Sequence, residues 1–289
     1  MPGIPFKQVD VFTGVRFKGN PVAVVLAADT LTTEQMQHVA NWTNLSETTF
    51  VVAPARSTAD YRVRIFTPAA ELPFAGHPTV GTAHALMEAG LIRPKHGALV
   101  QECGAGPINL KVEELPDGQW ISFELPQPSA TPLSDSRVAE IEGMLGVAVS
   151  HEHAPCLIDV GVRWVVAQVR DAQVVVSARP DLQCMASTDL DAEGVVIFGE
   201  YPAGSQARIA VRAFAPRQGV NEDPVCGSGN GCVAAFIRHT GQTPHFGAEY
   251  VASQGAVLGR AGRIRLSIGE SSISVGGQAV TCINGHLSV

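Results

Sequence analysis

The sequence repeats one short pattern about half the chain length apart. An alternating strand pattern ends at Arg64–Pro68 (RIFTP) and again at Arg212–Pro216 (RAFAP). In each copy an acidic residue and a proline follow, then a glycine, and then a segment of helical composition. This order of strand, loop, glycine and helix, present twice, indicates an internal duplication. We therefore expect two similar halves.

Both helices of the repeat lack a polar face along their middle. We expect the first over residues 79–90 and the second over residues 228–240. A helix that is apolar on all sides is buried on all sides. The sequence thus predicts an α+β fold of two pseudo-symmetric halves, each a barrel-like mixed sheet around one central helix.

Other elements have local signals. A capping box at Thr32 predicts a helix to about Trp42, and Ser134 or Asp135 begins another that ends near Gly146. Strand patterns occupy residues 22–26, 49–52, 61–66, 108–112, 120–125, 163–169, 194–199, 208–214 and 263–268.

A proline-rich segment, residues 126–132 (PQPSATP), interrupts the strand pattern and predicts a linker. We expect one half over residues 1–127, with Glu47 and the GHP turn, and the other over residues 128–289, with the EDPVCGSG turn. The last strand could return to the first half.

Composition excludes several classes of function. The formal net charge is −7 and the basic residues form no run, which disfavours nucleic-acid binding. No apolar stretch approaches the roughly 18 residues of a membrane-spanning helix, and the N-terminus lacks the pattern of a signal peptide. The six cysteines form no C-x-x-C pair and no zinc spacing, so we expect reduced thiols, a cytoplasmic protein and no bound metal.

The two glycine turns that open the central helices are candidate anion sites. Helix N-termini expose unpaired N–H groups and carry partial positive charge. Two such turns facing one cleft would suit a small anionic metabolite. The alternative is that both are only tight strand-to-helix turns.

One acidic residue lies at the entrance to an apolar strand. Glu47 is flanked by hydroxyl residues and followed by residues 50–52 (FVV). It is either a residue at a solvated edge or a carboxylate held in a cleft, where desolvation would suit it to proton transfer. His77 and Asp223, taken singly, leave the same two alternatives open.

Several motifs occur in a familiar order. Residues 44–50 (NLSETTF), 72–81 (LPFAGHPTVG) and 222–228 (EDPVCGS) together resemble the PhzF family of phenazine biosynthesis-like isomerases, and residues 9–13 (VDVFT) and 19–24 (GNPVAV) fit as well. The resemblance spans essentially the whole chain. It implies the fold of the diaminopimelate epimerase superfamily, with the active site between two halves. It also implies a homodimer.

The resemblance also implies roles for individual residues. It implies isomerisation by a proton shuttle without a cofactor, in which Glu47 carries the proton and His77 and Asp223 complete the catalytic set. The resemblance further implies that the second glycine turn, within residues 222–228, binds the substrate carboxylate. The implied substrate-binding residues are Ser46, Gly76, Cys226, Gly227 and Ser228.

The second turn departs from the usual pattern, which has threonine where this chain has Cys226. Cys-Gly-Ser-Gly is similar to the turn of cysteine-pair racemases and epimerases, but the matching position of the first half is Ala75. Three interpretations remain open. Cys226 fills the space of a threonine, or is a second proton-transfer group across from Glu47, or is a redox-sensitive thiol whose pKa is lowered by the helix N-terminus.

From these features we expect a cofactor-independent PhzF-like isomerase acting by proton transfer on a small carboxylate-bearing metabolite in a biosynthetic process. One alternative is an amino-acid or hydroxy-acid epimerase that uses Glu47 and Cys226. The other is a non-catalytic metabolite-binding protein on the same scaffold.

Overall fold

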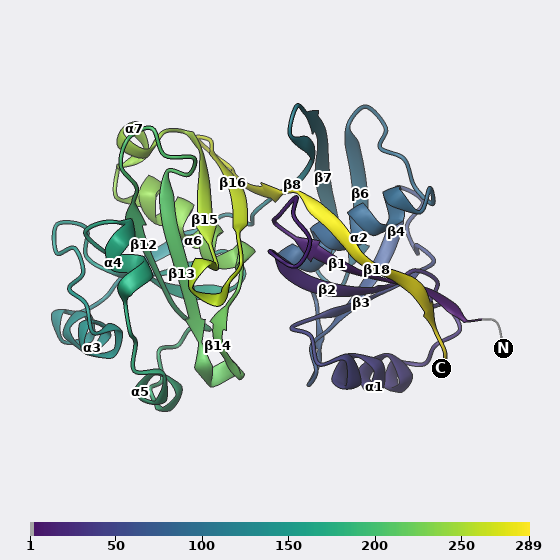
Figure 1. Ribbon diagram of the computed structural model, residues 1–289, viewed down its shortest axis with the longest axis horizontal. Coiled ribbons are helices and arrows are strands. Elements are labelled where there is room, and N and C mark those ends of the chain that lie inside the picture. The colour runs from purple at the N-terminus through teal and green to yellow at the C-terminus, as the bar shows by residue number, and fades with distance from the viewer. Residues whose placement is uncertain (1–2) are drawn as a thin grey trace. The chain divides into compact units, whose positions relative to one another are not determined.

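The computed structural model describes residues 3–289. It divides into two compact units, each built on a mixed sheet and one central helix (Figure 1). The first unit runs through Glu124 and includes Gly276–Val289, and the second is Leu125–Val275. The α+β fold with two pseudo-symmetric halves is therefore as predicted.

The first unit contains these elements: β1 (Ile4–Val11), β2 (Asn20–Val25), α1 (Thr33–Thr43), β3 (Thr48–Val52), β4 (Tyr61–Phe66), β5 (Glu71–Leu72), α2 (Gly76–Glu88), β6 (Ala98–Cys103), β7 (Gly106–Leu115), β8 (Gly118–Glu124) and β18 (Ala279–Leu287). The second contains β9 (Ser129–Pro132), α3 (Asp135–Leu145), β10 (Cys156–Asp159), β11 (Arg163–Gln168), α4 (Ala172–Ser177), α5 (Leu182–Ser187), β12 (Gly194–Glu200), β13 (Ile209–Ala215), β14 (Val220–Asp223), α6 (Gly227–His239), α7 (Thr243–Phe246), β15 (Glu249–Gln254) and β16 (Gly262–Ile268). Strand β17 (Ile273–Gly277) crosses the boundary, and short 3₁₀ turns cover Pro216–Gln218 and Ala256–Leu258.

The two sheets have the same strand order. In the first, β18, β1, β2, β3, β4, β6 and β7 are successive neighbours, with β2 parallel to β3 and β4 parallel to β6. In the second, β9, β10, β11, β12, β13, β15 and β16 follow one another, with β11 parallel to β12 and β13 parallel to β15. All other pairs in both series are antiparallel. This match in order and direction is the duplication seen in the sequence.

The two central helices, α2 and α6, are buried along most of their length. Close packing depends on glycine in both. A Cβ atom at Gly81 would lie 2.4 Å from Val22 Cγ1, and one at Gly231 would lie 2.5 Å from Leu125 Cδ1. The apolar character of these segments therefore did predict burial on all sides.

The amphipathic helices cover the outside of each sheet. Helix α1 begins at the predicted capping box of Thr32 and Gln35 and packs Met36 and Ala40 into a cluster with Phe50 and other apolar side chains. Helix α3 begins after the N-cap Ser134 and packs into the main apolar cluster of the second unit. None of the helices in residues 3–289 has the length and apolar composition that crossing a membrane requires.

Three local predictions differ from the structure. Helix α2 begins three residues earlier than expected, because Pro78 fits within a first turn, where its missing N–H has no intrahelical partner. The short helices α4 and α5 were not predicted, and the run Val174–Val176 in α4 has strand composition. The expected linker is partly a strand, since β9 pairs with β10.

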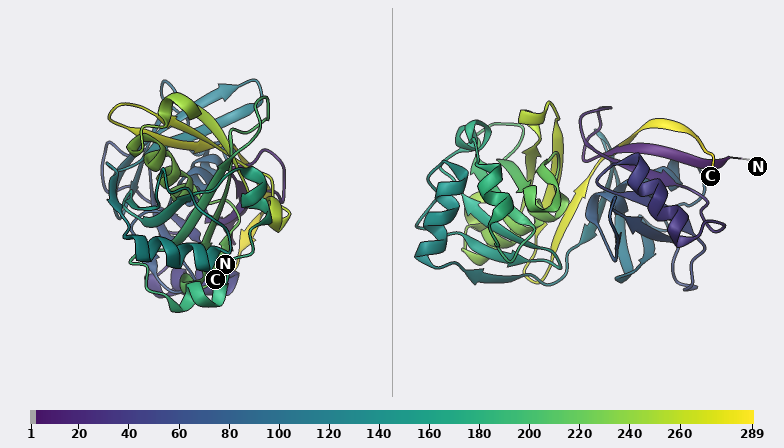
Figure 2. Two further views of the ribbon diagram at one scale, coloured as in Figure 1. Left: turned by 90° about the vertical axis from the view of Figure 1, so that its left-hand side faces the viewer. Right: turned by 90° about the horizontal axis from the view of Figure 1, so that it is seen from below.

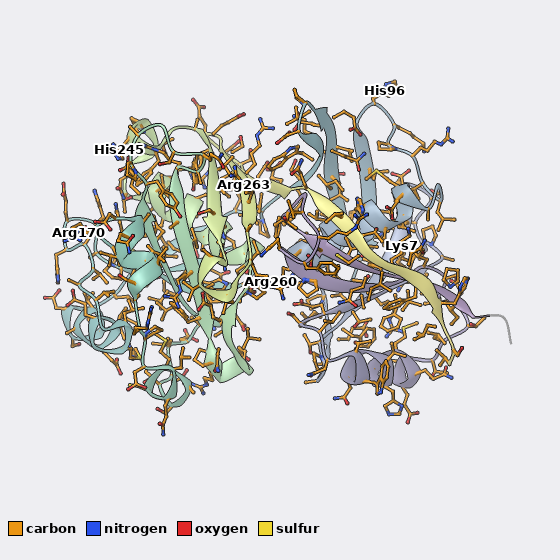
Figure 3. The ribbon with its side chains drawn as sticks, viewed as in Figure 1. Lys7, His96, Arg170, His245, Arg260 and Arg263 are labelled. Carbon is orange, nitrogen blue, oxygen red and sulfur yellow. The ribbon has the colours of Figure 1, made fainter. Side chains whose placement is uncertain are left out.

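The first and last strands of the described residues lie side by side. The last strand, β18, pairs antiparallel with β1 from Ile4 opposite Leu287 to Val11 opposite Ala279. Figure 2 shows the two strands running together along the first unit. Lys7 on β1, labelled in Figure 3, has its Nζ 2.5 Å from Glu88 Oε2 at the end of α2. Thr281 Oγ1 on β18 donates to the same oxygen, so both terminal strands are tied to the central helix.

Candidate active site

The first candidate half-site joins the start of β3 to the start of α2. Glu47 immediately precedes β3, and its side chain is 16% exposed, against 8% for His77. His77 is the second residue of α2, and its Nε2 lies 3.2 Å from Glu47 Oε2. Ser46, the preceding residue, is half-buried. The structure therefore brings together two of the three predicted catalytic side chains.

The His77 ring is neutral at ordinary pH. Burial lowers its pKa to about 3, and a hydrogen bond to the backbone carbonyl of Pro21 only partly offsets this. Because Nε2 faces Glu47, the nitrogen that donates to Pro21 is Nδ1. Neutral imidazole carries only one N–H, so Nε2 presents a lone pair to the carboxyl group. Nε2 and Oε2 lie 3.2 Å apart without the geometry of a hydrogen bond, and a proton placed between them would have to come from Glu47.

The second candidate half-site is the turn before α6. Cys226 is the N-cap, and the Gly229 N–H donates to its Sγ at 3.2 Å. This is the role that a serine or threonine hydroxyl has at a helix start. Burial raises the pKa of the Cys226 thiol well above its usual value, nearby Asp223 adds to the effect, and hydrogen bonds from Ser228 and Gly229 oppose it. Of the three interpretations of Cys226, this disfavours the redox-sensitive thiol with a lowered pKa, since desolvation of the thiolate opposes the helix dipole.

Asp223 ends β14, two residues before the buried Val225. Its Oδ1 accepts a hydrogen bond from the Val225 N–H at 2.9 Å. Burial raises the pKa of Asp223 to about 6, although hydrogen bonds from Val225 and Cys226 work against the shift. The carboxyl group therefore changes charge close to neutral pH, as a group exchanging protons requires.

A buried glutamine holds this turn in place, and no local sequence pattern predicts it. Gln254, the last residue of β15, accepts hydrogen bonds at Oε1 from the Cys226 N–H (3.1 Å) and the Asn230 side-chain amide (2.7 Å). Its Nε2 donates to the Asp223 carbonyl at 2.8 Å. One side chain thus fixes the backbone on both sides of residues 224–225.

Ser228 occupies the first turn of α6, where the sequence placed a substrate-binding residue. Its Oγ accepts a hydrogen bond from Trp164 Nε1 at 3.1 Å and lies 3.5 Å from Cys226 Sγ. Trp164 comes from β11, far away in the sequence, and only the fold shows that the two residues meet.

The carboxylate of the first unit has no counterpart in the second. Thr48 on β3 pairs with Phe66, and Val195 on β12 pairs with Phe214 of the second R-x-F-x-P copy. The position equivalent to Glu47 is therefore Gly194, where a Cβ atom would lie 1.8 Å from the Phe214 carbonyl oxygen. The turn is present in both units, whereas this acidic side chain is present in one.

Comparison with known proteins agrees with these features over nearly the whole chain. The family model for PhzC-PhzF, phenazine biosynthesis-like proteins, matches residues 9–285. "Antisense-enhancing sequence 1" of Schizosaccharomyces pombe is 43% identical over 97% of each chain. Trans-2,3-dihydro-3-hydroxyanthranilate isomerase of Pseudomonas fluorescens is 36% identical over 87% of this chain and 86% of its own.

A solved structure shares the fold. The crystal structure of the PhzF-family phenazine biosynthesis protein of Bacillus anthracis superposes with a TM-score of 0.88 and 26% identity, covering 100% of both chains. Sequence motifs, duplicated topology and these relatives together show that the chain belongs to the PhzC-PhzF family and is an isomerase of that family.

Proposed function

We propose that this isomerase acts without a cofactor, by proton transfer on a small carboxylate-bearing metabolite, and that Glu47 carries the proton. The contact of 3.2 Å between Glu47 Oε2 and His77 Nε2 carries the proposal. It supports proton transfer because the lone pair of neutral His77 Nε2 can accept a hydrogen bond from Glu47 once Glu47 is protonated. The 36% identity to an isomerase of trans-2,3-dihydro-3-hydroxyanthranilate supports that compound, or a close relative of it, as the substrate.

In the proposed reaction the Glu47 carboxylate removes a proton from one carbon of the substrate. The C–H electron pair moves into the conjugated system, a double bond shifts, and Glu47 returns the proton to a different carbon. Substrate and product have the same atoms and the same oxidation state, so no co-reactant is needed. Neutral His77 accepts a hydrogen bond from protonated Glu47 and stabilises the enzyme between the two transfers.

The substrate carboxylate is proposed to accept hydrogen bonds from the turn at Gly227 and Ser228. The N–H groups of the first turn of α6 and the Ser228 hydroxyl supply donors, and the helix dipole favours negative charge there. Gly76 and the backbone of His77 offer the equivalent turn in the first unit, and Ser46 lies next to Glu47. In this proposal Asp223, with its pKa raised to about 6, completes the catalytic set.

Cys226 is proposed to replace a threonine rather than to act as a second base. Its Sγ already accepts the Gly229 N–H, and the raised pKa keeps it a thiol at neutral pH. The matching N-cap of the first unit, Ala75, carries no thiol at all. The state of Cys226 disfavours the alternative epimerase that would use Glu47 and Cys226, and the absence of a thiol at Ala75 disfavours a two-thiol epimerase.

The proposal includes a cytoplasmic protein and a homodimer. All six cysteines are free, which suits a reducing compartment. The homodimer rests on family membership.

The test is turnover of trans-2,3-dihydro-3-hydroxyanthranilate in D₂O by enzyme dialysed against EDTA, with product and deuterium content measured by mass spectrometry. We expect isomerisation in the wild type and a fall in kcat of roughly 10²-fold or more in Glu47→Gln, the usual size of a general acid–base contribution. Glu114→Gln, on an exposed stretch of β7, is the control and should leave turnover unchanged. Wild-type rates in Glu47→Gln would refute the assignment of Glu47. Loss of activity after dialysis, restored by a metal, would refute cofactor independence.

A further inference from the structure

The hydroxyl group of Ser228 has one partner that fixes its direction. Trp164 is only 4% exposed, and its Nε1 lies 3.1 Å from Ser228 Oγ. An indole N–H can donate a hydrogen bond but cannot accept one. Ser228 Oγ must therefore be the acceptor in this contact.

Accepting from Trp164 leaves the Ser228 hydroxyl hydrogen to point elsewhere. The other side chain recorded next to Oγ is Cys226, whose Sγ lies at 3.5 Å and is a weak acceptor. A carboxylate oxygen is a much stronger acceptor, because hydrogen bonds to ionised groups are roughly twice as strong as neutral ones. A ligand with an anionic oxygen at this turn would therefore take the hydroxyl hydrogen from the thiol.

We propose that Trp164 is a positioning residue that holds Ser228 as a hydrogen-bond donor and so selects ligands that present an anionic oxygen to the turn. This deepens the proposed function and rests on it in one respect, that Ser228 contacts the substrate. With Trp164 in place, the indole N–H occupies one of the two acceptor lone pairs of Ser228 Oγ, so a ligand amide or ammonium group has only the remaining one, whereas an anionic oxygen can take the hydroxyl hydrogen. Without its N–H, the hydroxyl can rotate and serve either kind of ligand.

The chain offers a matched control. Trp120 on β8 is 7% exposed, and its Nε1 donates to Asp117 Oδ1 at 3.0 Å. Trp120→Phe removes the same N–H from a similarly buried ring, away from both turns in the sequence. Trp164→Phe retains most of the apolar ring and removes the donor to Ser228.

The experiment measures binding by calorimetry of two probes, anthranilate and 2-aminobenzamide, which differ in presenting a carboxylate or a neutral amide. We expect Trp164→Phe to weaken anthranilate about fivefold to tenfold, the size of one hydrogen bond, with 2-aminobenzamide unchanged or tighter. We expect Ser228→Ala to weaken anthranilate at least as much, and adding Trp164→Phe to Ser228→Ala to have no further effect. Trp120→Phe should match the wild type.

Equal losses for both probes in Trp164→Phe, or the same loss with and without Ser228, would show that the ring acts by packing and would overturn the inference. So would the absence of anthranilate binding by the wild type. These measurements need no turnover. If the Trp164→Phe and Ser228→Ala double-mutant cycle gives the expected affinities but the protein does not isomerise the dihydro compound, the proposed substrate is refuted. The role of Trp164 is then still supported.

A second measurement avoids any change at Trp164. In ¹⁵N-labelled Ser228→Ala, the indole N–H of Trp164 should shift upfield and exchange with solvent faster than in the wild type, whereas that of Trp120 should not change. An unaltered Trp164 resonance would overturn the inference even if Trp164→Phe failed to fold.

Discussion

The two helix-opening turns of this protein have the same backbone plan but differ in how the helix start is capped. In the first, the N-cap is Ala75, without a side-chain cap, and the third helical residue is Pro78. In the second, the N-cap is Cys226, and its sulfur accepts the N–H of the third helical residue, Gly229. Proline has no N–H, so the first turn has no donor where the second needs a cap. The N-cap residue thus has an accepting side chain only in the turn whose third helical residue has an N–H to donate.

In both turns the side chain of the fourth helical residue donates a hydrogen bond to the carbonyl of the N-cap residue. Thr79 Oγ1 donates to the Ala75 carbonyl at 2.9 Å, and the Asn230 amide donates to the Cys226 carbonyl at 2.8 Å. A further chemical difference lies just outside the turns, where the first unit has Glu47 and the second has Gly194. The duplicated turn is therefore the shared framework, and the glutamate beside it is present in the first unit alone.

The two copies of the R-x-F-x-P repeat should differ most in what their arginines contribute to stability. Arg212 Nε and Nη2 donate to the two oxygens of Glu222 at 2.9 and 2.8 Å, and Arg64 does the same to Glu71 at 2.8 and 2.7 Å. The first pair is buried, at 7% and 9% exposure, whereas the second is 23% and 40% exposed.

Arg212→Met should therefore lower the free energy of unfolding by about 3–5 kcal/mol, because it leaves a buried carboxylate without its partner. Arg64→Met should cost at most about 1 kcal/mol, as for an exposed pair. Urea unfolding measures both. Equal costs would mean that burial does not distinguish the two copies.

The glutamines of the two units give the next largest effect. Gln254 bonds to the backbone of the turn, whereas Gln101 on β6 accepts from Tyr61 Oη (3.0 Å) and donates to Thr79 Oγ1 (2.9 Å). Gln254→Leu should destabilise by about 1–3 kcal/mol, the cost of leaving buried polar groups unpaired, and should also lower kcat/KM. Gln101→Leu should lower stability alone. An active, fully stable Gln254→Leu enzyme would contradict this positioning role.

A smaller effect is expected at the caps. Cys226→Ala should cost about 1 kcal/mol of stability, the usual value of an N-cap, whereas Cys226→Ser should retain the cap and most of the activity. Ala75→Ser should gain less than about 0.5 kcal/mol, because Pro78 offers no N–H. Thermal unfolding measures the change in stability of each variant, and a parallel assay measures its activity. Inactive but stable Cys226→Ser would revive the thiol as a proton carrier.

An effect of similar size to that of the Cys226 cap concerns pH. The pKa of Asp223 is raised to about 6 by burial, above its unfolded value, so folding favours its protonated form. Its contribution to stability should rise as pH falls through about 6. Relative to Asp223→Asn, the wild type should gain about 1 kcal/mol between pH 7 and pH 5 in urea unfolding. Parallel pH curves for the two proteins would refute the raised pKa.

Short-range signals in the sequence predicted much of this architecture. The capping box at Thr32, the N-cap at Ser134 and the alternation of Tyr61–Phe66 lie within a few residues of what they specify. The contacts of the turns depend on the folded sheet. Trp164 on β11 donates a hydrogen bond to Ser228 on α6, and no local sequence pattern predicts this contact. The direction of the Cys226 pKa shift likewise depends on burial, which the helix-start motif does not encode.

The pairing of β1 with β18 has a consequence for how the chain is made. The second unit is continuous in sequence, so it can complete its sheet as soon as Val275 has left the ribosome. The first unit begins earlier but must wait for the final strand, since β1 keeps one edge unpaired until Ala279–Leu287 arrives. Domains made on the ribosome usually fold from the N-terminus onward. Here the half that is synthesised first is completed last, and losing the final few residues would damage the beginning of the protein.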